Sequence, residues 1–211
     1  MRKKLWIFVG FGILVLVSMG GPVSAAWHNE TVDSIGIVGG SSSLALSSHG
    51  KPYISYYDVT NGDLKYAWKD ASGWHNSTVD SSSIVGPYTS LALDSHGKPR
   101  ISYWDGTNGD LKYAWMGNGG WHNSTVDSSG VVGEFTSLAL DSHGKPRISY
   151  YDRTNGDLKY AWMAARGWHN VTVDNIGNVG GYTSLALDSH GKPRVSYRDV
   201  TNDDLKYAWK T

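Results

Sequence analysis

The sequence predicts an all-β fold, a four-bladed β-propeller with four antiparallel strands in each blade. Residues 121–167 differ from residues 74–120 at only nine positions, and Trp27, Trp74, Trp121 and Trp168 are each 47 residues apart. A fixed period of this length indicates repeated supersecondary units. Each repeat contains four short strand-like runs separated by turn signals, which is typical of a propeller blade. The two ends of the repeat array also complement each other, which predicts a closed ring.

The third repeat shows the four runs clearly. They are residues 137–141 (SLALD), 146–152 (PRISYYD), 157–162 (DLKYAW) and 168–174 (WHNVTVD). Val, Ile, Tyr, Trp and Thr are enriched in them, as a packed pleated surface requires. Gly or Pro recurs about every ten residues, so no helical period survives.

The connections between these runs have the composition of tight turns. Gly144 can take the left-handed position in the first turn, and Pro146 stands at the start of a strand, where its missing N–H is tolerated. Asn155-Gly156 is a strong hairpin signal between the second and third runs. The first run has small side chains and the outer runs are rich in Tyr and Trp, which places the first run nearest the axis.

The ends of the array predict how the ring closes. Residues 27–33 match a fourth strand, and residues 204–209 match a third strand that lacks a fourth. The predicted blades are therefore 42–80, 89–127, 136–174, and 183–211 completed by 27–33. Closure hides sheet edges that would otherwise aggregate. A ring within one chain is favoured because the ends complement each other there, and the alternative is an eight-bladed ring of two chains.

The first 25 residues differ from the repeats and predict a secretory signal peptide. Arg2, Lys3 and Lys4 precede an apolar run, and the small residues of 23–25 predict cleavage after Ala25. The alternative is an uncleaved membrane anchor, but the run is short for a span. We therefore expect a secreted or cell-envelope protein with no membrane span after cleavage.

Charge and cysteine content narrow the function. Cleavage would leave 16 basic and 19 acidic residues, a net charge of −3, which is not the basic footprint of a nucleic-acid-binding protein. The chain has no cysteine, so no disulfide holds it, and ten Trp and thirteen Tyr supply large side chains for a core.

The pattern SLALDSxGxPxISYYD, followed by NGDLKYA, W and TVD, resembles the repeat of secreted bacterial and archaeal β-propellers. It is distantly similar to the Asp-box and sialidase-like propellers and to propeller lectins. The resemblance covers residues 27–211 and implies the propeller fold. The Asp-box pattern itself is absent, because Lys-Pro follows Gly144, so the resemblance implies no site residues.

One candidate ligand site combines aromatic residues and carboxylates on one face. The second strand of each blade ends in an aromatic residue and an aspartate, and further aspartates end the fourth strands. An aromatic plane beside carboxylates is suited to a sugar, although blade packing and turn capping explain the same residues. The candidates are Tyr57, Asp58, Trp104, Asp105, Tyr151, Asp152, Asp33, Asp80, Asp127 and Asp174, and Arg198 replaces the aromatic residue in the last repeat.

Three further motifs have structural alternatives. The Asp-x-Thr-Asn-Gly-Asp turns are weak calcium candidates at Asp58, Asp63, Asp105, Asp110, Asp152 and Asp157, but they lack a distal glutamate. Apart from calcium, no cofactor is expected, and the eight histidines are spread around the ring rather than gathered at a metal site. The in-phase N-x-Thr sequons are glycosylation candidates at Asn29, Asn76, Asn123 and Asn170.

Near-identical blades favour binding over catalysis. An active site needs different residues in different roles around one point, whereas these repeats offer the same residues four times. Equivalent weak sites gain avidity on a surface with many copies of the ligand. We therefore expect a non-enzymatic, lectin-like module that binds carbohydrate. The alternatives are an extracellular scaffold that binds protein and, less favoured, a glycosidase-like or sialidase-like enzyme.

Overall fold

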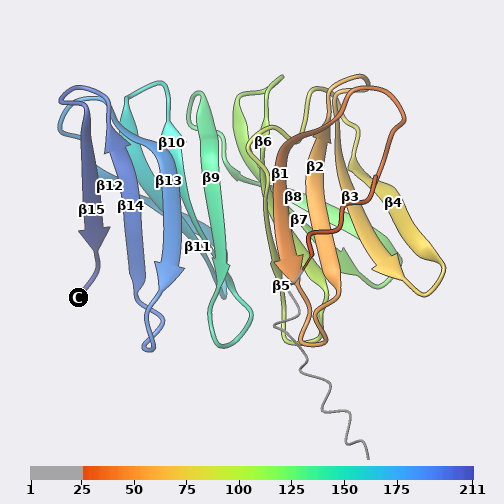
Figure 1. Cartoon of the computed structure of the whole chain (residues 1–211). Helices are drawn as coiled ribbons and strands as arrows, with labels where there is room; N and C mark the ends of the chain where they lie inside the picture. Colours follow the sequence, from red (N-terminus) through yellow and green to blue (C-terminus); the bar gives the residue numbers. More distant parts are fainter. Residues whose placement is uncertain (1–25) are drawn as a thin grey trace, which may run out of the picture. The chain divides into compact units, whose positions relative to one another are not determined.

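The computed structural model describes residues 26–211, and all its strands lie in the compact unit Thr31–Thr211. The predicted signal peptide lies outside the described residues. Four sheets follow one another along the chain, and each is an antiparallel meander (Figure 1). This is the blade architecture of a β-propeller.

Three of the sheets are complete four-stranded blades. Blade 1 consists of β1 (Val38–Leu46), β2 (Pro52–Asp58), β3 (Asp63–Asp70) and β4 (Gly73–Asp80). Blade 2 consists of β5 (Ser90–Leu93), β6 (Pro99–Asp105), β7 (Asp110–Gly117) and β8 (Gly120–Asp127). Blade 3 consists of β9 (Val132–Leu140), β10 (Pro146–Asp152), β11 (Asp157–Ala164) and β12 (Gly167–Asp174). Blade 4 has three strands, β13 (Val179–Leu187), β14 (Pro193–Asp199) and β15 (Asp204–Trp209).

The first strands of blades 1, 3 and 4 begin four residues before the predicted blade boundaries of 42, 136 and 183. The extra residues rejoin the second strand after a register shift, as between the pairs Ser149–Ser137 and Tyr151–Glu134 in blade 3. Such a bulge leaves residues of the first strand without a partner and reorients their side chains. The prediction missed it because a bulge has no alternating pattern.

The hydrophobic core lies between successive blades rather than within one sheet. Leu64, Tyr66 and Val79 of blade 1 pack against Ile101 and Tyr103 of blade 2, and the same arrangement recurs at the next two junctions. A blade is therefore stabilised by its neighbours, as expected for repeat proteins.

At each of the three junctions, an aspartate of one blade is hydrogen-bonded to side chains of the next blade. The Asp80 carboxylate, at the end of β4, accepts hydrogen bonds from the Tyr103 hydroxyl at 2.6 Å and from Lys112 Nζ at 2.7 Å, both in blade 2. Burial alone would raise the pKa of Asp80, but the hydrogen bonds from Lys112, Tyr103 and Ser82 together outweigh burial and lower the pKa to about 2. Asp127 and Asp174 make the same contacts with blades 3 and 4.

The tryptophans of the fourth strands of blades 2 and 3 also reach the preceding blade. Trp121 packs edge-on against Tyr66 with 5.2 Å between ring centroids, and its Nε1 donates to Ser77 Oγ. Trp168 repeats this contact with Tyr113 and Ser124. The 47-residue spacing of Trp121 and Trp168 therefore reflects a packing contact that is repeated at the first two junctions.

Residues 27–33 are not in a strand, so the structure does not show the predicted completion of blade 4 by these residues. Within residues 26–211, β15 pairs only with β14, so its outer edge is open. Asp33 instead bonds to blade 1, accepting from Tyr56 Oη at 2.7 Å and Lys65 Nζ at 2.8 Å. Asp33 thus makes the contact that a fourth-strand aspartate makes with the following blade, and the closing strand remains a prediction.

The described residues contain no helix long and apolar enough to span a membrane.

We expect Asp80→Asn to lower the free energy of unfolding by about 3 kcal/mol at pH 7, because it leaves buried Lys112 without its closest counter-charge. The folded-state pKa of Asp80, about 2, lies below the ordinary 3.8, so this contribution is present above about pH 4. It is lost as the pH falls through about 2. Urea denaturation of both proteins between pH 7 and pH 2 should show the difference shrinking over this range.

The matched control is Asp70→Asn. Asp70 is a half-exposed carboxylate hydrogen-bonded to Ser72 and His75 within its own blade. Its replacement should have a much smaller effect on the urea midpoint. Equal losses in the two variants would mean that the contact between blades has no special role.

Candidate functional site

A row of aromatic rings spans blades 2, 3 and 4. Phe135 lies between Tyr88 and Tyr182, with ring centroids 4.6 Å and 4.4 Å away. Trp104 lies 6.0 Å from Tyr88, and Tyr151 lies 6.3 Å from Phe135. Two of the five rings, Trp104 and Tyr151, are candidate ligand residues predicted from the sequence. The structure joins them through Tyr88 and Phe135, which the sequence did not predict as candidates, and Tyr182 also contacts Phe135. We call these five residues the aromatic row.

Three of the five residues have a strained backbone conformation. Tyr88, Phe135 and Tyr182 have φ angles of 57°, 54° and 53°. A bulky residue in this left-handed region is a true outlier and costs about 1–2 kcal/mol. Asn or Gly would adopt the conformation at lower cost. Such strain clusters at functional sites, where the surrounding structure holds it in place.

The bulge in the first strand explains why the rings lie here. Gly133 precedes the bulge in blade 3 with φ 102°, and a Cβ there would lie 2.7 Å from Leu111 Cα in blade 2. Only glycine allows the two blades to approach this closely. The chain then turns through the left-handed residue, which presents its ring beside the ring of the next blade.

Two charge pairs border the aromatic row, and both involve residues that break the repeat. Arg153 Nη1 donates to Glu134 Oε1 at 3.2 Å, with Glu134 buried and Arg153 mostly exposed. Arg198 Nη2 donates to Asp203 Oδ1 at 2.7 Å, and both side chains are exposed. Burial raises the pKa of the Tyr88 hydroxyl, and the nearby Glu134 charge raises it further. The row therefore combines apolar ring faces with exposed guanidinium groups.

The other aromatic candidate, Tyr57, lies apart from the row. It occupies the position of Trp104 and Tyr151 in the repeat, but blade 1 has Ser41 where the other blades have a ring. Among residues 26–211, no ring contact joins Tyr57 to another aromatic residue. The four subsites expected from the sequence are therefore not equivalent, and three of the four blades contribute to one extended surface.

The aspartates at the ends of the second strands cap turns. Asp152 is buried, and its carboxylate accepts hydrogen bonds from the backbone N–H and the side-chain amide of Asn155. The residues that share this arrangement are Asp58, Asp105, Asp152 and Asp199. The structure thus gives these aspartates the turn-capping role, which was the alternative to ligand binding.

The aspartates that the sequence places at the ends of the fourth strands are also occupied by protein contacts, although Asp33 lies in no strand. Asp33, Asp80, Asp127 and Asp174 each bind a tyrosine hydroxyl and a lysine of the following blade. Burial alone would raise the pKa of Asp127, but Lys159 and Tyr150 lower it by hydrogen bonding. These carboxylates join blades.

The weak calcium candidates do not gather around one point. Within residues 26–211, no group of three or more His, Asp or Glu side chains is placed to hold a metal ion. Asp63, Asp110 and Asp157 lie close to the capping aspartates, and burial and then this neighbouring charge raise the pKa of each. The sequon residues Asn29, Asn76, Asn123 and Asn170 are all exposed and remain candidates for glycosylation.

Sequence reasoning missed Tyr88, Phe135 and Tyr182. The available signal was an aromatic residue at the same position in three repeats, after Val-Gly-x and before Thr-Ser-Leu. The sequence places this position in the loop just before each predicted blade. A left-handed backbone angle cannot be inferred from an aromatic residue, because such residues rarely adopt it.

The comparisons with known proteins bear on the fold. No protein-family model matches the chain, and no curated protein matches it. A protein of unknown function from Dyadobacter fermentans matches with a TM-score of 0.59 and 14% identity, over 79% of this chain and 51% of that one. An exo-β-1,3-galactanase from Phanerochaete chrysosporium, solved with galactose, matches with a TM-score of 0.57 and 11% identity, over 89% and 52%. The chain therefore spans about half the length of these proteins, and at this identity the likeness shows the fold alone.

We expect Tyr182→Gly to stabilise the protein by about 0.5–1 kcal/mol. Relief of the left-handed backbone, about 1–2 kcal/mol, exceeds the entropy that glycine adds to the unfolded chain, about 0.5–1 kcal/mol. The Tyr182 ring is 67% exposed, so its removal uncovers little apolar surface. Urea denaturation measures the change.

Tyr182→Val is the matched control, because it also removes the ring but keeps a Cβ and adds branching. It should destabilise the protein, since a β-branched residue fits φ 53° poorly. If the glycine and valine variants were equally stable, backbone strain at this position would be negligible.

Proposed function

We propose that the protein is a secreted, non-enzymatic binding module whose aromatic row binds carbohydrate. The observation that carries the proposal is the aromatic row itself. Its five rings contact one another across three blades, and three of them belong to residues with a left-handed backbone. Aromatic faces bind the apolar C–H faces of sugar rings, and neighbouring polar groups bind the hydroxyls.

The charge pairs support a polar or acidic saccharide. Arg153 and Arg198 are exposed at the ends of their pairs, so each guanidinium keeps free donors toward solvent. A guanidinium can bind a carboxylate or vicinal hydroxyls with two parallel hydrogen bonds. A row of rings flanked by two arginines is suited to a chain of several sugars.

The carboxylates of this face support binding rather than hydrolysis. Glycoside hydrolysis in most enzyme families uses two carboxyl groups, which flank the scissile bond and contact the sugar. Asp105 and Asp152 cap turns, Asp80 and Asp127 join blades, and Glu134 is paired with Arg153. Because these carboxylates are already bound within the protein, we propose that the aromatic and arginine side chains are the groups that contact a ligand.

A glycan array, followed by calorimetry on the best ligand, tests the proposal. Trp104→Ala, Phe135→Ala and Tyr151→Ala should each weaken binding by about 5- to 10-fold, because each removes a stacking face of about 1 kcal/mol. β-1,3-Galactans belong in the array, since one structural match is named for them. Circular dichroism should show that each variant remains folded.

Tyr57→Ala is the matched control, because Tyr57 has the same place in its blade but lies outside the row. It should leave affinity unchanged. Equal losses at Tyr57 and Tyr151 would favour four equivalent subsites over one extended surface. Binding to no glycan would refute the carbohydrate proposal, and turnover of a chromogenic glycoside would refute the non-enzymatic part.

A further inference from the structure

Each junction between blades has a leucine that fits against a glycine of the next blade. Leu64, Leu111 and Leu158 are fully buried. Leu64 lies so close to Gly86 that a Cβ on this glycine would be 2.9 Å from Leu64 Cα. Shifting by the 47-residue period, the next members of this series are Leu205 in blade 4 and Gly39 in blade 1.

These two residues have no such partner. Leu205 is 85% exposed, and a Cβ on Gly39 would meet nothing within 4 Å. Gly39 nevertheless has a positive φ of 90°, and the φ angles of the packed glycines are also positive, between 102° and 110°. Blade 1 and blade 4 therefore each carry one half of a junction that is complete at three other places in the chain.

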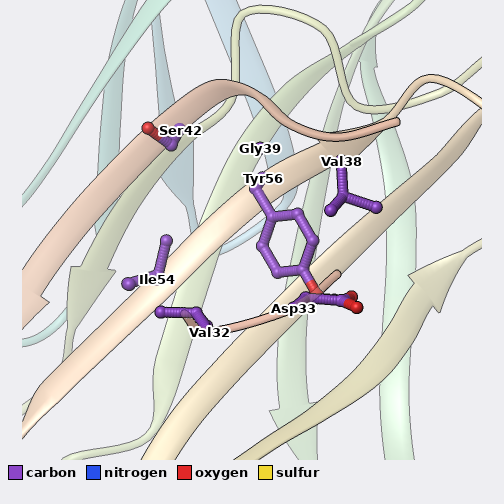
Figure 2. A pocket seen from close by; sticks show the side chains of 7 residues that line it. All are labelled: Val32, Asp33, Val38, Gly39, Ser42, Ile54 and Tyr56. Carbon is purple, nitrogen blue, oxygen red and sulfur yellow. The ribbon is translucent and has the colours of Figure 1, made fainter. Parts of the chain in front are cut away.

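The half-junction on blade 1 contains a cavity of about 200 Å³. It is lined by Val38, Gly39 and Ile54, together with Val32 and Tyr56 (Figure 2). The corresponding residues of the complete junction, such as Val85 and Ile101, surround Leu64. Figure 2 shows Asp33 at the Tyr56 hydroxyl, at one end of this cavity. The cavity is thus shaped for a leucine from a preceding blade.

The half on blade 4 includes an exposed apolar face and a second cavity. Tyr207 and Trp209 are more than half exposed, while the equivalent Tyr66 is buried. A cavity of about 250 Å³ lies beside Tyr160, Val171 and Val195. In blades 1 and 2 the tyrosine equivalent to Tyr160 holds a tryptophan edge-on. The tryptophan at the matching point of the period is Trp27.

Successive blades are related by the same contacts at all three junctions, and we call this repeated arrangement of one blade on the next a step. The tyrosine-to-aspartate hydrogen bond is 2.6 or 2.7 Å at all three junctions, and a leucine N–H donates to a serine hydroxyl at 3.0 Å at each of them. After three such steps Leu205 and Leu44, on the two end faces, are still exposed. Closing one chain on itself would require a larger turn at each close-packed junction, which packed interfaces resist. A second copy closes the ring by repeating the existing junction.

We propose that two copies of the chain form one ring of eight blades. Residues 27–33 of each copy pair with β15 of the other, Trp27 enters the cavity beside Tyr160, and Leu205 enters the cavity beside Gly39. Two identical head-to-tail contacts related by a two-fold axis then leave no open end. This arrangement is independent of the proposed carbohydrate binding.

Light scattering on the protein, expressed as the full chain and purified, should give twice the mass of one chain. Leu205→Asp places a charge in an apolar cavity and should weaken dimerisation by about 100-fold or more. Val200→Asp, at another exposed apolar residue of blade 4, is the control and should leave the dimer intact. A monomeric mass for the unsubstituted protein at micromolar concentration would overturn the proposal.

Disulfide trapping identifies which copy supplies the strand, and the absence of native cysteine keeps it free of side reactions. Ala161 pairs with Asn170 in blade 3, so the period predicts Ala208 opposite Asn29. An Asn29→Cys protein mixed with an Ala208→Cys protein should give a covalent dimer on oxidation. A double variant that instead forms the bond within one chain would establish the four-bladed ring and overturn the proposal.

Trp121→Ala is the matched control for Trp27→Ala. Both remove a tryptophan that packs on a tyrosine of the preceding blade, but the Trp121 contact lies within the chain. We expect Trp121→Ala to lower the free energy of unfolding and retain the dimer, while Trp27→Ala weakens the dimer. If Trp27→Ala left dimerisation unchanged, the strand exchange would be wrong.

Discussion

Blades 1, 2 and 3 each end in an aspartate whose side chain is bound by the next blade, and this contact determines how the blades are arranged. Hydrophobic burial holds neighbouring blades together, but it is not directional and does not fix their relative rotation. The carboxylate that binds a tyrosine hydroxyl and a lysine ammonium fixes this rotation, because charge-assisted hydrogen bonds are short and depend on geometry. Asp80, Asp127 and Asp174 make this contact in the same way, and Asp33 makes it from outside any strand. The aromatic row, the glycine contacts and the open end faces all depend on the resulting step between blades.

Much of the fold could be predicted from the sequence because its signals are local. The Asn-Gly turns and the proline at the start of β10 mark hairpins whatever the rest of the chain does. The site was harder to predict because identical aspartates have the same sequence context whether they face a ligand, a turn or another blade. Asp152 was a candidate for sugar and calcium, yet it caps a turn. Phe135 was passed over because its role depends on a backbone angle that its residue type disfavours.

The repeat explains why the blades are alike, but it does not explain where they differ. Arg153, Glu134, Arg198 and Asp203 break the repeat, and they form two ion pairs beside the same row of rings. Blade 1 has Ser41 in place of the ring, although its backbone keeps the left-handed angle. The scaffold therefore tolerates the strained position without an aromatic residue. Packing alone does not require rings at the other three positions, which is a physical reason to seek their role in a ligand.

The absence of a ring at Ser41 in blade 1 also connects the proposed carbohydrate binding with the proposed dimer. In a ring of eight blades, the aromatic row of each copy would be separated from the next by a blade with no ring at the bulge. Two extended surfaces would then face the same side at a fixed spacing, because both lie on equivalent loops of one rigid assembly. A ligand repeated along a polysaccharide or on a surface could occupy both, and the second contact would form at a high effective concentration. Strand exchange between copies would thus provide the multivalency that four equivalent blades were expected to provide, while each binding surface spans several sugars.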